Sequence, residues 1–173
     1  MAILAKRTAA DIGGGEGFTI TTAHCGDSRI VILDGWDGAE FGIITETVDH
    51  KPSVPSEAQR ITDLGGKVCQ FRGAGPMRVN GDLSVSRSLG DFRYKRYITS
   101  EPAVSAQRII SRSTKIILAS DGFFEVATKQ DIAFVLTHYA DDPRDAVTRL
   151  YNIAGVRGST DNITIMLVDF VDG

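Results

Sequence analysis

The chain has 173 residues, 42% apolar and 24% charged, which is the composition of an ordinary globular domain with a sizeable core. A net charge of −3 and a pI near 5.6 provide no basic surface, so neither nucleic acid nor a membrane is an expected partner. No window approaches the roughly 20 apolar residues of a membrane span, and the N-terminal apolar stretch is too short for a secretory signal. We expect an intracellular, cytoplasmic protein, with the nucleus as the alternative compartment.

Strand patterns dominate the first half of the chain. The runs that are rich in β-branched or apolar residues and bounded by turn residues are 18–24, 29–33, 41–47, 67–71 and 83–86. A helix is predicted to begin at Pro55 and to end at Gly65-Gly66. Its inward face is expected to carry Ala58, Ile61 and Leu64.

In the second half of the chain, two predicted strands are followed by two helices and a last strand. Strands are predicted at 104–110 and at 115–120, and the second is nearly all apolar and therefore central. Thr128 and Asp131 form a capping box for a helix to residue 139, with Ile132, Val135 and Leu136 inward. A second helix is expected from Asp142-Pro143 to about Ala154, and a buried terminal strand over 162–170.

This order of elements predicts the fold class. The strands are not separated regularly by helices, so a largely antiparallel α+β fold is favoured over a doubly wound one. Six to eight strands in so short a chain would form two stacked sheets with helices on the outer faces. We expect residues 1–173 to form a single domain.

Several residues that could carry chemistry are better explained structurally. Cys25 and Cys69 lie in strand-like surroundings and are expected to be reduced and buried. His24 is expected to pack in the core rather than to act as a base, and residues 13–15 to form a hairpin connection rather than a phosphate loop. No nucleophile elbow and no P-loop lysine motif occurs in the sequence, which disfavours covalent serine chemistry and P-loop nucleotide chemistry.

Four acidic residues remain as candidate metal ligands. Asp121 and Asp161, 40 residues apart, each stand where an apolar strand meets a glycine or an asparagine, and Mg²⁺ and Mn²⁺ prefer such oxygen donors. Glu125 would share a helical face with Asp121, and Asp27 lies in the turn between two strands. Taken singly, each is explained as well or better as a turn, capping or solvated residue.

Five segments together resemble the metal-dependent type 2C family of serine/threonine protein phosphatases. The segments are 25–29 (CGDSR), 49–52 (DHKP) with Glu57 and Arg60-Ile61, 78–92 (RVNGDLSVSRSLGDF), 119–126 (ASDGFFEV) and 158–164 (GSTDNIT). The resemblance implies a β-sandwich flanked by helices, and a centre of two or three Mg²⁺ or Mn²⁺ ions whose bound water attacks phosphoserine and phosphothreonine in proteins. It also implies that Asp121 and Asp161 are metal ligands, and that Asp27 and Glu125 serve an additional metal.

The resemblance also has a gap. The family's early aspartate-glycine-histidine-glycine-glycine motif and its phosphate-holding arginine are absent from the sequence, so we expect an N-terminally incomplete domain. The chain could be a fragment, a short relative that has lost catalysis, or a protein that a partner chain completes. An inactive pseudophosphatase that acts as a binding module is therefore the alternative function, and another metal-dependent phosphate ester hydrolase is a third.

Overall fold

The computed structural model describes residues 2–11, 16–35, 40–106, 108–111 and 113–170. The chain divides into two compact units. The first unit contains Met1–Thr22, Ser28–Thr47 and Val104–Gly173, and the second contains Ala23–Asp27 and Val48–Ala103. Within the described ranges, no helix is long and apolar enough to cross a membrane.

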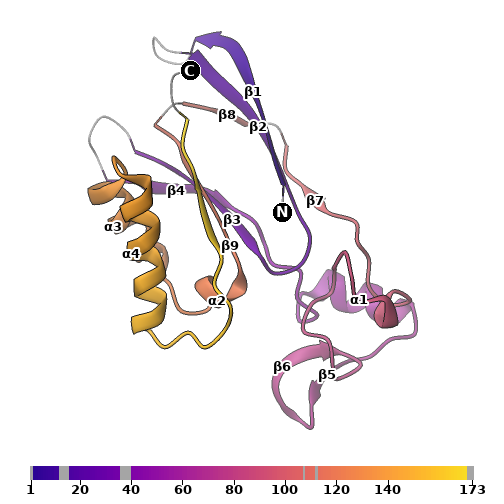
Figure 1. The fold of residues 1–173 in the computed structure, drawn as a ribbon. Helices are drawn as coiled ribbons and strands as arrows, with labels where there is room; N and C mark the ends of the chain where they lie inside the picture. The colour runs from indigo at the N-terminus through magenta and orange to yellow at the C-terminus, as the bar shows by residue number, and fades with distance from the viewer. Residues whose placement is uncertain (1, 12–15, 36–39, 107, 112, 171–173) are drawn as a thin grey trace. The chain divides into compact units, whose positions relative to one another are not determined.

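The first unit is built on two sheets (Figure 1). One sheet has the strand order β1 (Ala2–Asp11), β2 (Glu16–His24) and β7 (Ala103–Val104), with β8 (Arg108–Ile110) also paired with β2. The other has the order β10 (Ile165–Val168), β9 (Lys115–Ala119), β3 (Arg29–Asp34) and β4 (Gly42–Glu46). The registers of β10 with β9, β9 with β3, β3 with β4 and β2 with β8 are all antiparallel.

Strands β3 and β9 are apolar on both faces because both of their faces are covered. Successive side chains of a strand point to opposite faces. Ile30 and Ile32 of β3, with Ile116 and Leu118 of β9, pack with Ile20 of β2 and Ile110 of β8 and thereby join the two sheets. The alternate residues point to the other face, where helices cover them. The predicted α+β fold with two stacked sheets and flanking helices is confirmed.

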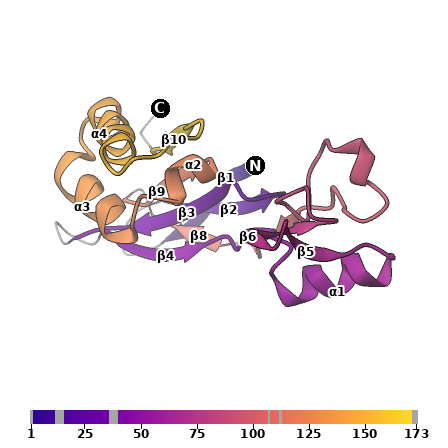
Figure 2. The same cartoon turned by 90° about the horizontal axis from the view of Figure 1, so that it is seen from below.

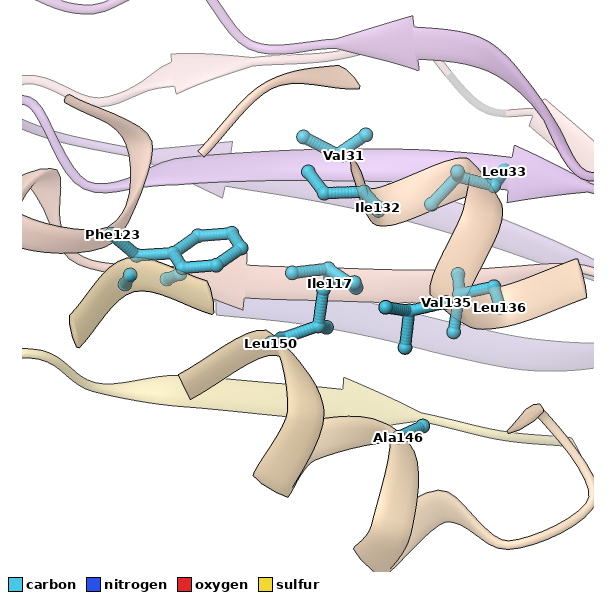
Figure 3. Packing of buried hydrophobic residues seen from close by; sticks show 11 residues of the cluster. Val31, Leu33, Ile117, Phe123, Ile132, Val135, Leu136, Ala146 and Leu150 are labelled. Atoms are coloured by element: carbon cyan, nitrogen blue, oxygen red, sulfur yellow. The ribbon is translucent and has the colours of Figure 1, made fainter. Parts of the chain in front are cut away.

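Two helices cover that other face of the β10-β9-β3-β4 sheet (Figures 1 and 2). Helix α3 (Lys129–Tyr139) begins with the predicted capping box of Thr128 and Asp131, and α4 (Pro143–Val156) with Asp142 accepting from the backbone N–H groups of Arg144 and Asp145. Figure 3 shows Val31, Leu33 and Ile117 of the sheet against side chains of α2 (Asp121–Phe124), α3 and α4. The labelled helical residues there are Phe123, Ile132, Val135, Leu136, Ala146 and Leu150.

The second unit contains helix α1 (Pro55–Asp63), the hairpin of β5 (Val68–Phe71) and β6 (Ala74–Val79), and the short helix η1 (Phe92–Tyr94). Its apolar centre consists of Ile61, Val79 and Ile98. Helix α1 ends as predicted, because Gly65 takes a left-handed conformation with φ +82°.

Three expectations about elements are wrong. Residues 83–86 form no strand, and Leu83 makes only an isolated bridge with Val79. The predicted strand 104–110 is instead the two short strands β7 and β8. The last strand is limited to Ile165–Val168, and it lies at the edge of its sheet, with Met166 57% exposed. Strand β6 was not predicted; it lies in the glycine-rich stretch after residue 71, where Gly73 and Gly75 take positive φ and shape the hairpin.

Two expectations about side chains also need correction. Leu64 is exposed rather than inward, and the charged Glu57 lies buried on the inner face of α1 beside Ile61. Both cysteines are free, as predicted, but Cys69 is exposed and Cys25 only partly buried. His24 is buried, as expected. The predicted glycine connection at residues 13–15 lies outside the described residues.

Candidate metal centre

Asp121 stands directly beyond the central strand β9. Ser120 is the N-cap of α2, and Asp121 is the first helical residue. Because β9 is paired on both sides and its last residue, Ala119, is fully buried, the backbone that presents Asp121 is firmly held. The residue Asp121 is only partly buried.

The loop that carries Asp161 is attached to the same place. Ser120 donates its N–H to the carbonyl of Thr164 at 3.1 Å and its hydroxyl to the carbonyl of Asn162 at 3.0 Å. Ser120 Oγ also accepts from the N–H of Thr164 at 3.0 Å. The hydroxyl of Ser159 donates to the carbonyl of Gly122 at 2.6 Å. These bonds join two loops that are about 40 residues apart in sequence.

Gly122 allows this close approach. A Cβ built on Gly122 would lie 2.6 Å from the carbonyl oxygen of Asn162 and 3.1 Å from Cβ of Asp161. Only a residue without a side chain fits there. The absence of a side chain at Gly122 thus lets the Asp161 loop lie directly against the backbone that follows Asp121.

The two carboxylates have suitable chemistry for a hard cation. Oδ1 of Asp121 accepts from the N–H of Gly122 at 3.0 Å, and Oδ1 of Asp161 accepts from the N–H of Asn162 at 2.6 Å. A carboxylate has two oxygens, so a local hydrogen bond to one is compatible with coordination through the other. Mg²⁺ is commonly held by one or two carboxylates together with waters and substrate phosphate. Each of the two carboxylates therefore has the donor chemistry that such an ion uses.

Glu125 lies one helical turn beyond Asp121. It is the C-cap residue of α2, and its N–H donates to the carbonyl of Asp121 at 2.9 Å. The predicted helical spacing is therefore present, and the side chain is exposed. Over the parts of the chain that the structure describes, no three His, Cys, Asp or Glu side chains gather into a group that could hold a metal.

Asp27 belongs to the second unit, in the turn that links β2 to β3. Its side chain is 16% exposed, and Oδ2 is paired with the ammonium of Lys51. Lys51 belongs to a segment that the sequence singled out, but no role was assigned to it. No local sequence pattern indicates the ion pair of Lys51 with Asp27, because 24 residues separate the two partners and they meet only in the folded chain.

A buried ionic network lies in the same unit and also escaped prediction. The carboxylate of Glu57 accepts from Arg87, from Arg60 and from the hydroxyl of Ser86. Burial would raise the pKa of Glu57, but these hydrogen bonds outweigh it and lower the pKa to about 2. Burial, with Arg87 and His24 nearby, lowers the pKa of His50 to about 4. At neutral pH Glu57 is therefore ionised and His50 is neutral.

The chain is similar to known proteins over most of its length. The family model described as protein phosphatase 2C matches residues 6–163. Rice (Oryza sativa subsp. japonica) and Arabidopsis thaliana each have a similar protein named "Probable protein phosphatase 2C 59". The rice protein is 38% identical over 156 residues, which is 90% of this chain and 45% of that protein. The Arabidopsis protein is 38% identical over 154 residues, which is 89% of this chain and 47% of that protein.

Solved structures agree with this match. A crystal structure of a phosphatase from Toxoplasma gondii superposes with a TM-score of 0.76 at 30% identity and covers 89% of this chain and 49% of that one. The chain thus spans about half the length of the proteins it matches. The family model covers nearly the whole chain, so the chain belongs to the protein phosphatase 2C family.

Proposed function

We propose that this chain takes part in the metal-dependent hydrolysis of phosphoserine and phosphothreonine in proteins, with Asp121 and Asp161 as ligands of Mg²⁺ or Mn²⁺. The observation that carries the proposal is the contact at Gly122, where the loop of one carboxylate lies against the backbone of the other. Two aspartates from distant positions whose loops lie against each other, in a chain of a phosphatase family, are better explained as joint ligands than as separate turn residues.

The residues of this chain would bind and orient the ions. Ser120 fixes both loops through its backbone and its hydroxyl, so the carboxylates are set in place before any ligand arrives. Their one-sided hydrogen bonds to Gly122 and Asn162 orient each carboxylate plane. When bound, such ions supply Lewis-acid activation of water and neutralise the charge that develops during phosphoryl transfer.

Asp27 and Glu125 have supporting roles in this proposal. Glu125 follows Asp121 by one turn and contributes negative charge near the pair, and Asp27 would serve an additional ion. The substrates proposed for the whole protein are phosphoproteins. We further propose that both units are parts of one phosphatase-like domain, which a longer segment or a partner chain completes.

The rival function is a binding module that keeps the fold without catalysis. It is favoured by the composition of the site, because no three His, Cys, Asp or Glu side chains gather into a possible metal group among the residues that the structure describes. Such a module would dock a partner protein through its surface and would not require divalent ions.

Metal binding and turnover separate these functions. Binding of Mn²⁺ is measured by electron paramagnetic resonance, and hydrolysis with p-nitrophenyl phosphate and a phosphothreonine peptide. Asp121→Asn and Asp161→Asn should each abolish the tightest Mn²⁺ binding and any hydrolysis. The matched control is Asp145→Asn, an exposed carboxylate paired with Arg149 on α4. Mn²⁺ binding that survives both substitutions refutes the metal assignment, and absence of Mn²⁺ binding in the unaltered chain favours the docking module.

A further inference from the structure

A groove runs between helices α3 and α4 of the first unit. The two helices lie side by side on the sheet (Figures 1 and 2). The groove has a volume of about 390 Å³, which is within the range of ligand-binding clefts. Phe134 and Tyr139 of α3 and Arg149, Ile153 and Val156 of α4 are among the residues that line it.

The groove exposes apolar side chains where a helix that faces water ordinarily carries polar ones. Phe134 is 57% exposed and Val156 is 89% exposed. The core-facing side of α4 is formed by other residues, of which Leu150 and Ala154 are fully buried. Phe134 and Val156 therefore lie outside the core and border one groove from two helices, so their apolar surface is available to a ligand.

Arg149 adds hydrogen-bond donors to this apolar surface. Its Nε donates to Oδ2 of Asp145 at 2.8 Å, and its guanidinium carbon lies 3.7 Å from the centroid of the Tyr139 ring. Over the described ranges, Nη1 and Nη2 of Arg149 donate to no other group. A guanidinium matches the geometry of a carboxylate, and its stack on Tyr139 restricts its motion before a ligand binds.

The other charged residues of the lining already have partners. Nη1 of Arg157 donates to the carbonyl of Val126 at 3.2 Å, and Nη2 donates to Oδ1 of Asp131 at 2.7 Å. Oδ2 of Asp131 accepts from the N–H and the hydroxyl of Thr128 in the capping box. Both oxygens of the Asp131 carboxylate are thus in use, whereas Arg149 keeps two donor groups. The charge of the groove therefore suits an anionic ligand better than a cationic one.

We propose that the groove between α3 and α4 docks a short peptide segment of a partner protein, in which an apolar side chain stands next to a carboxylate. The apolar side chain packs against Phe134 and Val156, and the carboxylate accepts from Nη1 and Nη2 of Arg149. A basic segment would meet Arg149 and Arg157 as like charges, and a purely apolar segment would leave the donors of Arg149 unused. This docking requires no metal ion.

The first test measures binding of a fluorescein-labelled peptide, Glu-Glu-Leu-Phe-Glu-Glu, to the whole chain by fluorescence anisotropy in the presence of EDTA. Arg149→Met keeps a long unbranched side chain without the charge, and it should weaken binding about tenfold, because it removes hydrogen bonds between charged groups. Arg144→Met is the matched control, since Arg144 is an exposed arginine of the same helix that does not line the groove.

A neutral peptide, Gln-Gln-Leu-Phe-Gln-Gln, separates charge recognition from apolar contact. It should bind the unaltered chain about tenfold more weakly than the acidic peptide, and Arg149→Met should not weaken it further, because the pairwise interaction is already absent. Val156→Asp tests the apolar end of the groove. Val156 is 89% exposed, so this substitution leaves the core intact while it places a negative charge against the acidic peptide and should weaken its binding.

Amide chemical shifts of the unaltered chain locate the bound peptide. The acidic peptide should shift the signals of Phe134, Ile153 and Val156, which border the groove. No binding of the acidic peptide, equal affinity for the two peptides, or shifts confined to other residues would each overturn the proposal. Sedimentation velocity tests the other occupant, a second copy of this chain. If the chain dimerises and Val156→Asp makes it monomeric, the groove is an interface between copies and the proposed peptide docking is wrong.

Discussion

Arg87 holds the buried carboxylate of Glu57 through two nitrogens: Nη2 donates to Oε1 at 2.7 Å and Nε donates to Oε2 at 3.0 Å. The carboxylate side chain is 5% exposed, and Arg87 also donates to the carbonyl of Glu101. This bidentate pair therefore ties helix α1 to the long segment that follows β6. Because the carboxylate is buried, loss of Arg87 would leave its charge in the interior with one of its two guanidinium partners removed.

Arg87→Ala should lower the free energy of unfolding of the second unit by about 3–5 kcal/mol, the usual cost of breaking a buried ion pair by removing one partner. Hydrogen exchange of the α1 amides in increasing urea measures the free energy of unfolding of this unit. Arg93→Ala is the control, because Arg93 is 84% exposed and lies 4.0 Å from Asp82. If Arg87→Ala loses no more stability than Arg93→Ala, other groups compensate the charge of Glu57.

Glu57→Gln should reveal the pH dependence of the same network. The pKa of Glu57 falls from an ordinary value of 4.5 to about 2 in the folded chain, so its ionised form stabilises the fold. That stabilisation is complete above the ordinary value and is lost as the pH falls from 4.5 toward 2. The stability difference between wild type and Glu57→Gln should shrink over this range in urea titrations. A difference independent of pH contradicts the charge assignment.

His50 should produce a separate effect at higher pH. Its pKa is lowered from 6.5 to about 4, so the unfolded chain binds a proton between these values that the folded chain does not. Stability should therefore fall as the pH decreases from 6.5 to 4. His50→Gln removes the titration while an amide oxygen can still accept from Gly26, so the stability curve should flatten there. His138→Gln, at the exposed end of α3, is the control.

Local signals account for the parts of the fold that the sequence predicted well. The capping box of Thr128 with Asp131, and Asp142 before a proline, act within one helical turn, so both helices begin where expected. The apolar run 116–119 indicates a strand covered on both faces, and β9 is central. In contrast, β5 was predicted but its hairpin partner β6 was missed, because the glycines around β6 are typical of a loop.

Most of the structural features that the sequence did not predict are interactions between residues far apart in the chain. Arg87 is 30 residues from Glu57, and Lys51 is 24 residues from Asp27, so neither pair leaves a local pattern. The sequence named Asp121 and Asp161 as candidates, but local spacing alone favoured a turn at each. Their shared contact through Gly122 exists only after two loops have been brought together by the pairing of β9 and β10.

Gly122→Ala tests whether that contact is needed by the candidate metal centre. The new methyl group would meet the carbonyl oxygen of Asn162 at 2.6 Å, an impossible distance for carbon, so the loop of Asp161 must move. Overpacking of this kind costs about 1–3 kcal/mol. We expect Mn²⁺ affinity at the Asp121 and Asp161 pair to fall by about tenfold or more, on the order of the loss when a supporting group is disturbed.

Gly155→Ala is the matched control for this substitution. Gly155 lies in α4, and a Cβ built on it meets no atom within 4 Å. Alanine favours a helix over glycine by about 1 kcal/mol, so this variant should be slightly more stable and should bind Mn²⁺ as the wild type does. Calorimetric titration of both variants with Mn²⁺ measures the two affinities. If Gly122→Ala is destabilised yet retains its affinity for Mn²⁺, the close approach of the two loops serves packing alone, and the two aspartates do not act as joint ligands.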